Sequence, residues 1–175
     1  MARPESRGRA LAYVGLGSNL ADPVTQLRAG IGLLAALAQT RVERCSSFYR
    51  TAPVGITQQP DFVNAVCRVE TGLEPVPLMH ALLDIEQRRG RVRDIPGGPR
   101  TLDLDLLLYY APDGSACQRH AGGLTLPHPR LHERAFVLYP LYELAPELEI
   151  PGHGQVAKLL TGCVGQTIEK LAITQ

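Results

Sequence analysis

The chain has 175 residues, of which 45% are hydrophobic and 20% charged, and its formal net charge is +1. These proportions exclude a disordered chain and a disulfide-stapled mini-protein, and the near-neutral charge excludes a polycation made for nucleic acid. No stretch has the roughly 20 uninterrupted apolar residues that a membrane span needs. Because no linker or internal repeat interrupts the chain, we predict a single domain over residues 1–175.

Residues 1–9 lead directly into a strand-like segment, without the apolar region and cleavage site of a signal peptide. We expect a flexible tail there, with a transit peptide as the alternative. The cysteines lie far apart and form no C-x-x-C pair, which argues against a zinc ribbon or a thioredoxin motif. We expect all of them to be reduced, as in the cytoplasm, where we place the protein. They are Cys45, Cys67, Cys117 and Cys163.

The first elements are a strand, a helix and a second strand. Residues Ala10–Gly17 are apolar and bounded by glycine, which predicts a buried strand. Asp22 followed by Pro23 predicts a helix start, because a capping carboxylate then precedes a proline at the first helical position. Helical spacing gives this segment one apolar stripe of Val24, Leu27, Ile31, Leu34 and Ala38. Arg41–Arg50 is predicted as the second strand.

A loop at Thr51–Asp61, with two prolines and a glycine, precedes a third strand at Phe62–Glu70. Alternation directs one set of this strand's side chains into a core: Val63, Ala65, Cys67 and Val69. The opposite face carries Phe62, Asn64, Val66 and Arg68. A second helix is predicted from Glu74-Pro75 to Gly90, and its buried stripe is Leu78, Leu82 and Ile85.

A polar loop at Arg91–Pro99 leads to the strongest strand, Thr101–Tyr110. A short strand at Leu124–Pro127 and a helix over Arg130–Leu144, bent at Pro140, follow. The remainder is predicted to form a small peripheral strand and a terminal helix. This order predicts an α+β fold, with a ferredoxin-like βαββαβ core and additional C-terminal strand and helices.

The segment Leu102–Leu106 is the first chemical signal. Alternation places Asp103 and Asp105 on one face of the strand, about 6.6 Å apart along it, so that their carboxylates can share divalent cations. The opposite face is predicted to carry Leu102, Leu104, Leu106 and Leu108. The alternative is a solvated strand face that carries two acids by chance.

Arginines crowd the segment just before these acids: Arg88, Arg89, Arg91, Arg93 and Arg100. Guanidinium groups bind phosphate oxygens, and Mg²⁺ bridges carboxylates to phosphates, so the pattern points to a metal–polyphosphate ligand. The alternative is a solvated basic loop paired with nearby acids. No Walker A loop is present, because GLGSN at residues 15–19 lacks the G-K-[ST] ending.

Two weaker signals remain. His128 and His132 have a spacing that can bind zinc on a helix, but prolines flank His128 and no third ligand is evident, so a phosphate contact by His128 is favoured. The alternative is a capping or packing histidine. Phe62 with Asn64 is a pair able to stack on and hydrogen-bond a flat heterocycle, and the alternative is a second core face.

Six segments together resemble one family, the 6-hydroxymethyl-7,8-dihydropterin pyrophosphokinases, from Tyr13 to Leu148. They are YVGLGSNL (13–20), SSFYRTAP (46–53), QPDFVNA (59–65), IEQRRGRVR (85–93), GPRTLDLDLL (98–107) and LPHPRLHERAFVLYPL (126–141). The resemblance implies an ATP-dependent diphosphokinase of tetrahydrofolate biosynthesis. It would transfer pyrophosphate from ATP to the hydroxymethyl group of 6-hydroxymethyl-7,8-dihydropterin, giving the pterin diphosphate and AMP.

The resemblance also implies a monomeric cytoplasmic enzyme with two Mg²⁺ ions, and ATP and the pterin as partners rather than nucleic acid or membrane. Asp103 and Asp105 would hold the metals and, with Arg91 and Arg100, be catalytic. The implied ATP contacts are Glu86, Arg91, Arg93, Arg100, His128 and Arg134. The implied pterin contacts are Thr51, Pro53, Val54, Phe62, Asn64 and Phe136. Positions that depart from some members are Leu83, Gly97 and Pro129.

Two rival functions use the same acids and arginines. A Mg²⁺-dependent phosphohydrolase would release phosphate without an acceptor and needs no pterin site. A non-catalytic ferredoxin-like module would bind nucleotide for regulation, and the crowding of acids with arginines argues against it.

Overall fold

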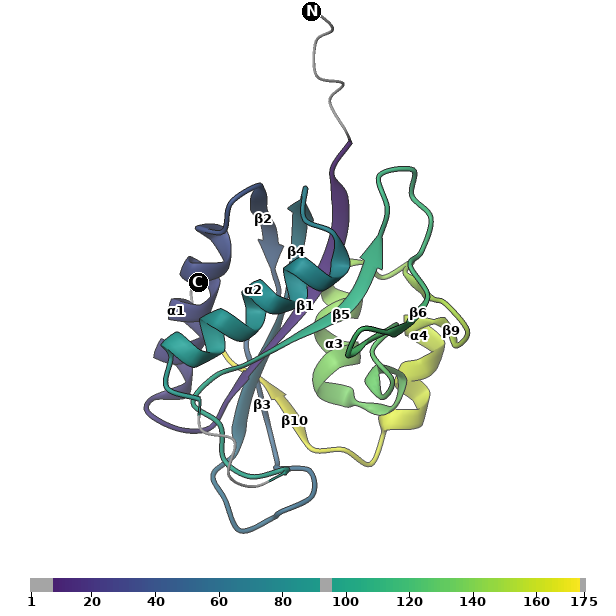
Figure 1. Cartoon of the computed structure of the whole chain (residues 1–175). Coiled ribbons are helices and arrows are strands. Elements are labelled where there is room, and N and C mark those ends of the chain that lie inside the picture. Colours follow the sequence, from purple (N-terminus) through teal and green to yellow (C-terminus); the bar gives the residue numbers. More distant parts are fainter. Residues whose placement is uncertain (1–7, 92–95, 174–175) are drawn as a thin grey trace, which may run out of the picture.

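The computed structural model describes residues 8–91 and 96–173. Within these ranges, a six-stranded antiparallel sheet forms the middle layer of the molecule (Figure 1). The strand order is β10-β3-β4-β1-β5, and β2 also pairs with β4. The strands are β1 (Ala10–Ser18), β2 (Thr40–Cys45), β3 (Tyr49–Thr51), β4 (Phe62–Thr71), β5 (Asp103–Tyr110) and β10 (Ile168–Lys170). The fold is therefore mixed α/β on an antiparallel sheet.

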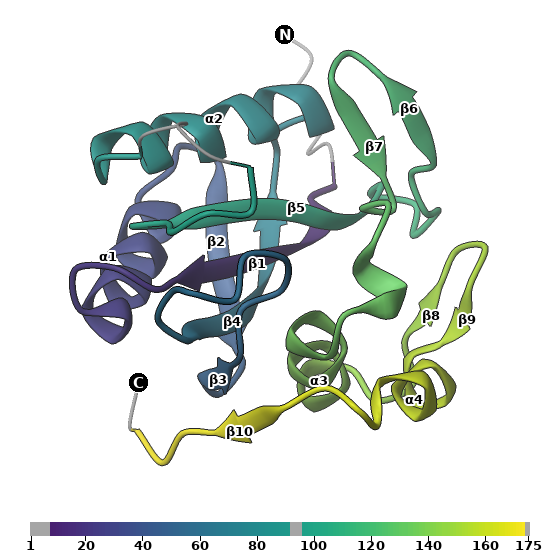
Figure 2. The same ribbon diagram turned by 90° about the horizontal axis from the view of Figure 1, so that it is seen from below.

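Helices cover both faces of the sheet (Figure 2). The helices α1 (Pro23–Ala35) and α2 (Pro75–Arg88) pack on one face, and their core includes Val14, Leu27, Leu82 and Leu104. Helix α3 (Ala135–Leu144) packs on the other face, where a second core includes Tyr13, Val66, Leu108 and Leu138. The alternation predicted for β4 is confirmed, because Val63 lies in the first core and Val66 in the second.

Local signals set the start of α1 and both ends of α2 close to the prediction, but α1 ends at Ala35, so Ala38 of the predicted stripe lies beyond the helix. The Asp22 carboxylate accepts hydrogen bonds from the backbone N–H of Thr25, at 3.4 Å, and from its hydroxyl, at 2.9 Å, and Pro23 opens α1. Helix α2 buries its apolar stripe and ends at Arg88, just before Gly90, which adopts a positive φ of 81°.

The strand predicted over 41–50 is interrupted, which corrects the single strand. Cys45 of β2 pairs with Cys67, and Tyr49 of β3 pairs with Asn64, so both strands pair with β4. Between them, the backbone N–H and the hydroxyl of Ser47 donate 2.9 Å hydrogen bonds to Glu143 of α3. Because these donors are turned to a helix carboxylate, the ladder breaks at this point.

Strand β5 contains a bulge that corrects the predicted leucine face. Tyr13 pairs with Leu108 whereas Val14 pairs with Leu106, so Leu107 is the extra residue. The bulge shifts the alternation by one, and Leu108 joins the second core while Leu104 and Leu106 stay in the first. The face that carries Asp103 and Asp105 lies before the bulge and is unaffected.

The chain after β5 has more short elements than predicted. They are β6 (Arg119–Ala121), β7 (Leu124–Leu126), η1 (Leu131–Glu133), β8 (Glu149–Ile150), β9 (Gly154–Gln155), α4 (Val156–Leu159) and η2 (Leu160–Cys163). Helix α3 begins only at Ala135 and contains Pro140. The prediction that a helix ends the fold is wrong, because the strand β10 follows η2 and pairs with β3.

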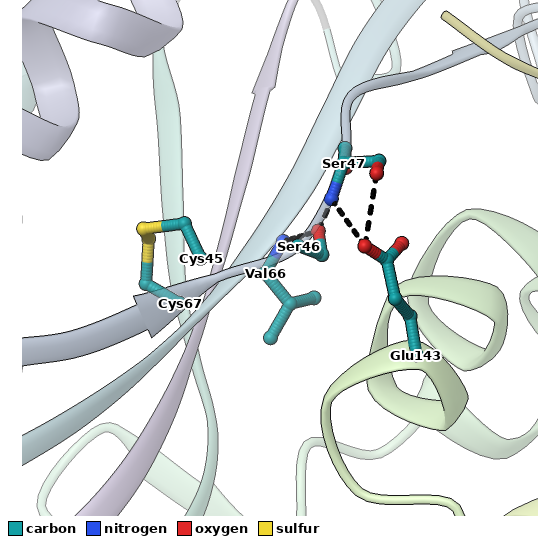
Figure 3. The surroundings of a disulfide bond; sticks show 6 residues. All are labelled: Cys45, Ser46, Ser47, Val66, Cys67 and Glu143. Atoms are coloured by element: carbon teal, nitrogen blue, oxygen red, sulfur yellow. Dashed lines mark hydrogen bonds between the residues drawn. A yellow bond between two sulfur atoms is a disulfide. The ribbon is translucent and has the colours of Figure 1, made fainter. Parts of the chain in front are cut away.

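Cys45 and Cys67 form a disulfide between β2 and β4 (Figure 3), so the prediction of four reduced cysteines is wrong for this pair. They face each other on paired antiparallel strands, with 4.1 Å between their Cα atoms, although 22 residues separate them in the chain. Cys117 and Cys163 are free.

Of the predicted tail, only residues 8 and 9 belong to the described part of the chain. Within the described ranges, the structure holds no helix with the length and apolar character needed to span a membrane.

Candidate functional site

Two cavities adjoin at the polar face of β5. The first, called here the aromatic cavity, has a volume of about 430 Å³ and lies between Phe62 and Phe136. The second, called here the α2 cavity, has a volume of about 760 Å³ and runs from Glu86 of α2 to His128. Asp105 and Arg100 line both cavities, so this pair stands on the wall that they share.

The predicted shared face of Asp103 and Asp105 is confirmed, because both line the aromatic cavity while Leu104 and Leu106 between and beyond them are buried. Burial raises the pKa of Asp105 to about 7, and the negative charges of Asp103 and Glu86 add to the rise. The nearby Arg134 and Arg91 oppose it. Crowded carboxylates of this kind gain from a cation between them.

Arg91 is held between two acids. Glu86, with 1% of its surface exposed, pairs with the Arg91 guanidinium and also accepts a 2.7 Å hydrogen bond from the backbone N–H of Leu104. The same guanidinium lies 3.5 Å from Asp103. Burial and the negative charge of Asp103 raise the pKa of Glu86. The hydrogen bond from the Leu104 N–H and the contact with Arg91 act in the opposite direction and lower it. Because both carboxylate oxygens of Glu86 contact the protein, Glu86 orients Arg91 and β5.

Asn19, which directly follows β1, positions Arg100. Its amide oxygen accepts a 2.8 Å hydrogen bond from the Arg100 backbone N–H, and its own backbone N–H donates to the Arg100 carbonyl at 3.0 Å. The Asn19 amide nitrogen also donates to Gln59 at 2.9 Å, and Gln59 in turn donates to the Gly97 carbonyl at 2.9 Å. One buried asparagine therefore joins the two loops that border the cavities.

Asn64 on β4 forms the floor of the aromatic cavity. Its amide nitrogen donates a 2.8 Å hydrogen bond to the Thr51 hydroxyl on β3. Its amide oxygen lies against Gly17, where a Cβ atom would come within 2.8 Å. Phe62 and Phe136 supply aromatic rings to the same cavity, and Arg134 lies 5.4 Å from the centre of the Phe136 ring.

The other residues that the resemblance implied are distributed unevenly. Val54 lines the aromatic cavity, but Pro53 lines a separate cavity of about 360 Å³ beside it. Arg134 lines the aromatic cavity, and His128 lines the α2 cavity. Burial lowers the pKa of His128, and the positive charges of Arg134 and Arg130 lower it further. The negative charge of Asp103 acts in the opposite direction. Arg93 lies outside the described residues.

The predicted arginine cluster is smaller than expected. The Arg89 guanidinium donates two hydrogen bonds, of 3.1 and 2.8 Å, to Gln26 of α1, so Arg89 joins α2 to α1 instead of facing the cavities. Arg88 is exposed at the end of α2. Arg91 and Arg100 remain as cavity-lining members. Of the positions that depart from the family, Leu83 and Pro129 line the α2 cavity and Gly97 lines the aromatic cavity.

The zinc reading of His128 and His132 finds no support in the described part of the chain. The His132 ring stacks on His153, with 3.7 Å between ring centres. Among the described residues, no group of three or more His, Cys, Asp or Glu gathers as a metal cage. A pair of carboxylates still fits Mg²⁺, which keeps waters and takes substrate phosphates as its remaining ligands.

Arg130 and Gly17 are among the lining residues that the sequence did not identify. Arg130 lines the aromatic cavity, and its only signal is its place in the PHPR segment next to His128. Gly17 lines it as well, and the need for glycine there is visible only once Asn64 lies beside it. Local patterns therefore identified the charged wall of the site better than its shape.

Carboxylates and guanidinium groups on the shared wall of two cavities define an enzyme of the phosphoryl-transfer class. The family model described as 7,8-dihydro-6-hydroxymethylpterin-pyrophosphokinase (HPPK) matches residues 13–146. The chain belongs to this HPPK family.

Curated relatives agree with this membership, and solved structures share the fold. The chain is 43% identical over 159 residues to a 2-amino-4-hydroxy-6-hydroxymethyldihydropteridine pyrophosphokinase of Pseudomonas aeruginosa, covering 91% of this chain and 95% of that one. The corresponding Haemophilus influenzae protein is 44% identical over 149 residues, with coverages of 85% and 90%. A crystal structure of an HPPK-DHPS in complex with substrates has a TM-score of 0.68 at 14% identity. The match covers 90% of this chain but 43% of that one, and it shows the fold alone.

Proposed function

We propose that this chain transfers pyrophosphate from ATP to the hydroxymethyl group of 6-hydroxymethyl-7,8-dihydropterin, with the pterin in the aromatic cavity and ATP in the α2 cavity. The observation that carries the proposal is the shared wall, where Asp105 and Arg100 line both cavities. A transfer between two substrates needs two adjoining sites with the charged groups at their junction. A phosphohydrolase needs no second cavity.

The proposed pterin site follows from the chemistry of its lining. The rings of Phe62 and Phe136 stack on the flat heterocycle, and the Asn64 amide hydrogen-bonds its polar edge. Thr51 acts through its hydrogen bond to Asn64, while Val54 and Pro53 belong to the loop that borders the ring. The hydroxymethyl oxygen then points toward β5.

Among the proposed ATP contacts, Arg91, Arg100 and His128 line the α2 cavity, and Glu86 holds Arg91 in place. By family resemblance the set also includes Arg134, which lines the adjoining aromatic cavity, and Arg93, which lies outside the described residues. The hydroxymethyl oxygen attacks the β-phosphorus and its proton passes to a nearby carboxylate, for which Asp105 is placed. The bond from that phosphorus to the oxygen of AMP breaks, and the guanidinium groups neutralise charge on the phosphate oxygens. Arg100 faces both cavities, which suits it to the group that is transferred.

We further propose that Asp103 and Asp105 hold Mg²⁺, two ions by family resemblance. Two crowded carboxylates beside a phosphate-binding cavity are a donor set that fits this cation. When bound, Mg²⁺ supplies charge neutralisation to the polyphosphate.

The finer architecture is also part of the proposal. A ferredoxin-like core is supported by the order β5-β1-β4, with β2 and β3 beyond β4 and with α1 and α2 on one face. A monomeric state is proposed from the family resemblance, and the near-neutral net charge of +1 favours small-molecule partners over nucleic acid. The use of ATP supports a cytoplasmic location, although the disulfide is unusual for a reducing compartment.

The test measures AMP formation from ATP, Mg²⁺ and the hydroxymethyl-dihydropterin, with and without the pterin. Asp103→Asn and Asp105→Asn are expected to lower turnover at least about a hundredfold. Asp84→Asn, on the exposed side of α2, is the matched control and should leave turnover unchanged. Phosphate release without the pterin, or normal turnover in either cavity variant, would contradict the proposed function.

A further inference from the structure

The start of α3 has an unusual capping residue. The first N–H groups of a helix have no partner within the helix, and a side-chain oxygen at the N-cap normally accepts from one of them. Here Arg134 occupies the N-cap position, with φ −109° and ψ 113°, and makes no side-chain capping bond. A guanidinium has no acceptor, and its positive charge is unfavourable at the positive end of the helix dipole.

Gln166, in the loop between η2 and β10, supplies what Arg134 lacks. Its amide oxygen accepts a 2.9 Å hydrogen bond from the backbone N–H of Ala135. Its amide nitrogen donates a 2.7 Å hydrogen bond to the carbonyl of Glu133. One side-chain amide therefore holds the backbone on both sides of Arg134, from 31 and 33 residues further along the chain.

The segment held in this way aims two side chains at the aromatic cavity. Arg134 and Phe136 both line it, and the guanidinium lies 5.4 Å from the Phe136 ring centre. The Arg134 guanidinium also interacts electrostatically with the carboxylates of Asp103 and Asp105 across the cavity. A change in the backbone at Glu133–Ala135 would therefore move a cation and a stacking ring together.

We infer that Gln166 is a positioning residue for the transfer reaction, acting through Arg134 and Phe136. This inference rests on the proposed function. Arg134 cannot cap the start of α3, and the amide oxygen of Gln166 accepts the hydrogen bond that a capping side chain would normally accept.

The fold offers a second anchor that lets Gln166 be varied. Strand β10 pairs with β3, Ile168 against Thr51, and the Leu171 N–H donates a 2.8 Å hydrogen bond to the Phe48 carbonyl. The loop that carries Gln166 is thus fixed at its far end without the amide. We expect Gln166→Ala to fold.

The experiment compares Gln166→Ala with Gln155→Ala, an exposed glutamine of β9 in the same C-terminal region. We expect Gln166→Ala to lower kcat/KM for the pterin about fivefold to tenfold, the size of one to two lost hydrogen bonds, and Gln155→Ala to leave it unchanged. Gln166→Glu keeps an acceptor for the Ala135 N–H and should recover part of the loss. Equal kinetics in the two alanine variants would overturn the inference.

A double-mutant cycle separates positioning from a merely structural role. If Gln166 acts through Arg134, then Gln166→Ala should cost much less activity in an Arg134→Ala background than in the native chain. Equal losses in both backgrounds would overturn the inference.

Amide hydrogen exchange supplies a readout without turnover. The Ala135 N–H should exchange faster in Gln166→Ala than in Gln155→Ala, and unchanged exchange would count against the inference. Absence of AMP formation by the native chain would instead overturn the proposed function, while the exchange result at Ala135 would still decide whether Gln166 holds α3.

Discussion

The amide nitrogen of Asn64 donates a 2.8 Å hydrogen bond to the hydroxyl of Thr51, and both residues are buried. This bond joins β4 to β3 and fixes the orientation of the amide, so that its oxygen lies against Gly17. A ligand in the aromatic cavity therefore meets a donor and an acceptor whose order is set by a neighbouring hydroxyl. Under the proposed function, recognition of the pterin would then depend on Thr51, a residue that need not touch the ligand.

Replacing the Thr51 hydroxyl should weaken pterin binding selectively. Thr51→Val keeps the shape of the side chain but leaves the Asn64 amide without its buried acceptor, so we expect the KM for the pterin to rise about tenfold. The KM for ATP should stay constant. Steady-state kinetics with each substrate varied in turn measures both values. Thr51→Ser keeps the hydroxyl and serves as the control; an equal effect of both variants would argue against the hydrogen bond as the cause.

Gly17 should resist even the smallest side chain. A Cβ atom there would lie 2.8 Å from the Asn64 amide oxygen, which is too close for a normal contact, so Gly17→Ala must displace that amide. We expect pterin affinity to fall about tenfold, measured by titration calorimetry. Gly32→Ala, in α1 with open space around it, is the control and should stabilise the helix by up to about 1 kcal/mol. Unchanged affinity in Gly17→Ala would show that Asn64 is not a pterin contact.

Glu143 should contribute stability that depends on pH. Burial raises its pKa, but hydrogen bonds from Tyr49 and Ser47 and the charge of Lys170 outweigh burial, so the pKa lies below its ordinary value of 4.5. The folded state thus prefers the carboxylate. Glu143→Gln weakens these charge-assisted bonds, and we expect it to lower the free energy of unfolding by about 1.5 kcal/mol at pH 7.

The direction of the Glu143 pKa shift determines how this stabilisation depends on pH. Because the folded pKa is depressed, the stabilisation is complete above 4.5 and is lost as the pH falls through the folded pKa. Urea unfolding of native chain and Glu143→Gln should give curves that converge in acid. Glu147→Gln, at an exposed position nearby, is the control. A stability difference that is constant from pH 7 into acid would contradict the assignment.

The disulfide predicts a thiol count. Unfolded in denaturant without reductant, the chain should show two reactive thiols, from Cys117 and Cys163, and four after reduction. Because the bond closes a loop of 22 residues, its reduction should lower the free energy of unfolding by about 3 kcal/mol. Four thiols before reduction would refute the bond. The Cys45→Ala, Cys67→Ala double variant should match the reduced protein in stability.

Sequence patterns predicted those parts of the fold that depend on neighbours along the chain. The acids of β5 share a face because alternation needs only local geometry, and α1 begins at Asp22-Pro23 because capping is local. The break between β2 and β3 could not be predicted, because the partner of Ser47 is Glu143, 96 residues further along. The disulfide could not be predicted for the same reason, because Cys45 and Cys67 come together only when β2 pairs with β4.

The candidate site shows the same division. Arg91 and Arg100 were identified by composition, but Arg89 was assigned to the same cluster although Gln26 of another helix binds it. Nothing local marked Gln166, whose partners are backbone groups at the start of α3. Sequence could predict which charges gather near β5, and it could not predict which distant side chains hold them in place.

The pairing of β10 with β3 has a consequence for biosynthesis. While the ribosome is still adding residues 168–170, the nascent chain already contains every other strand of the sheet, but the backbone groups on the outer side of β3 have no partner. An unpaired strand edge invites association with other chains. The pairing of β10 therefore shields this edge of β3, and the emerging polypeptide exposes it to misassembly until β10 has paired.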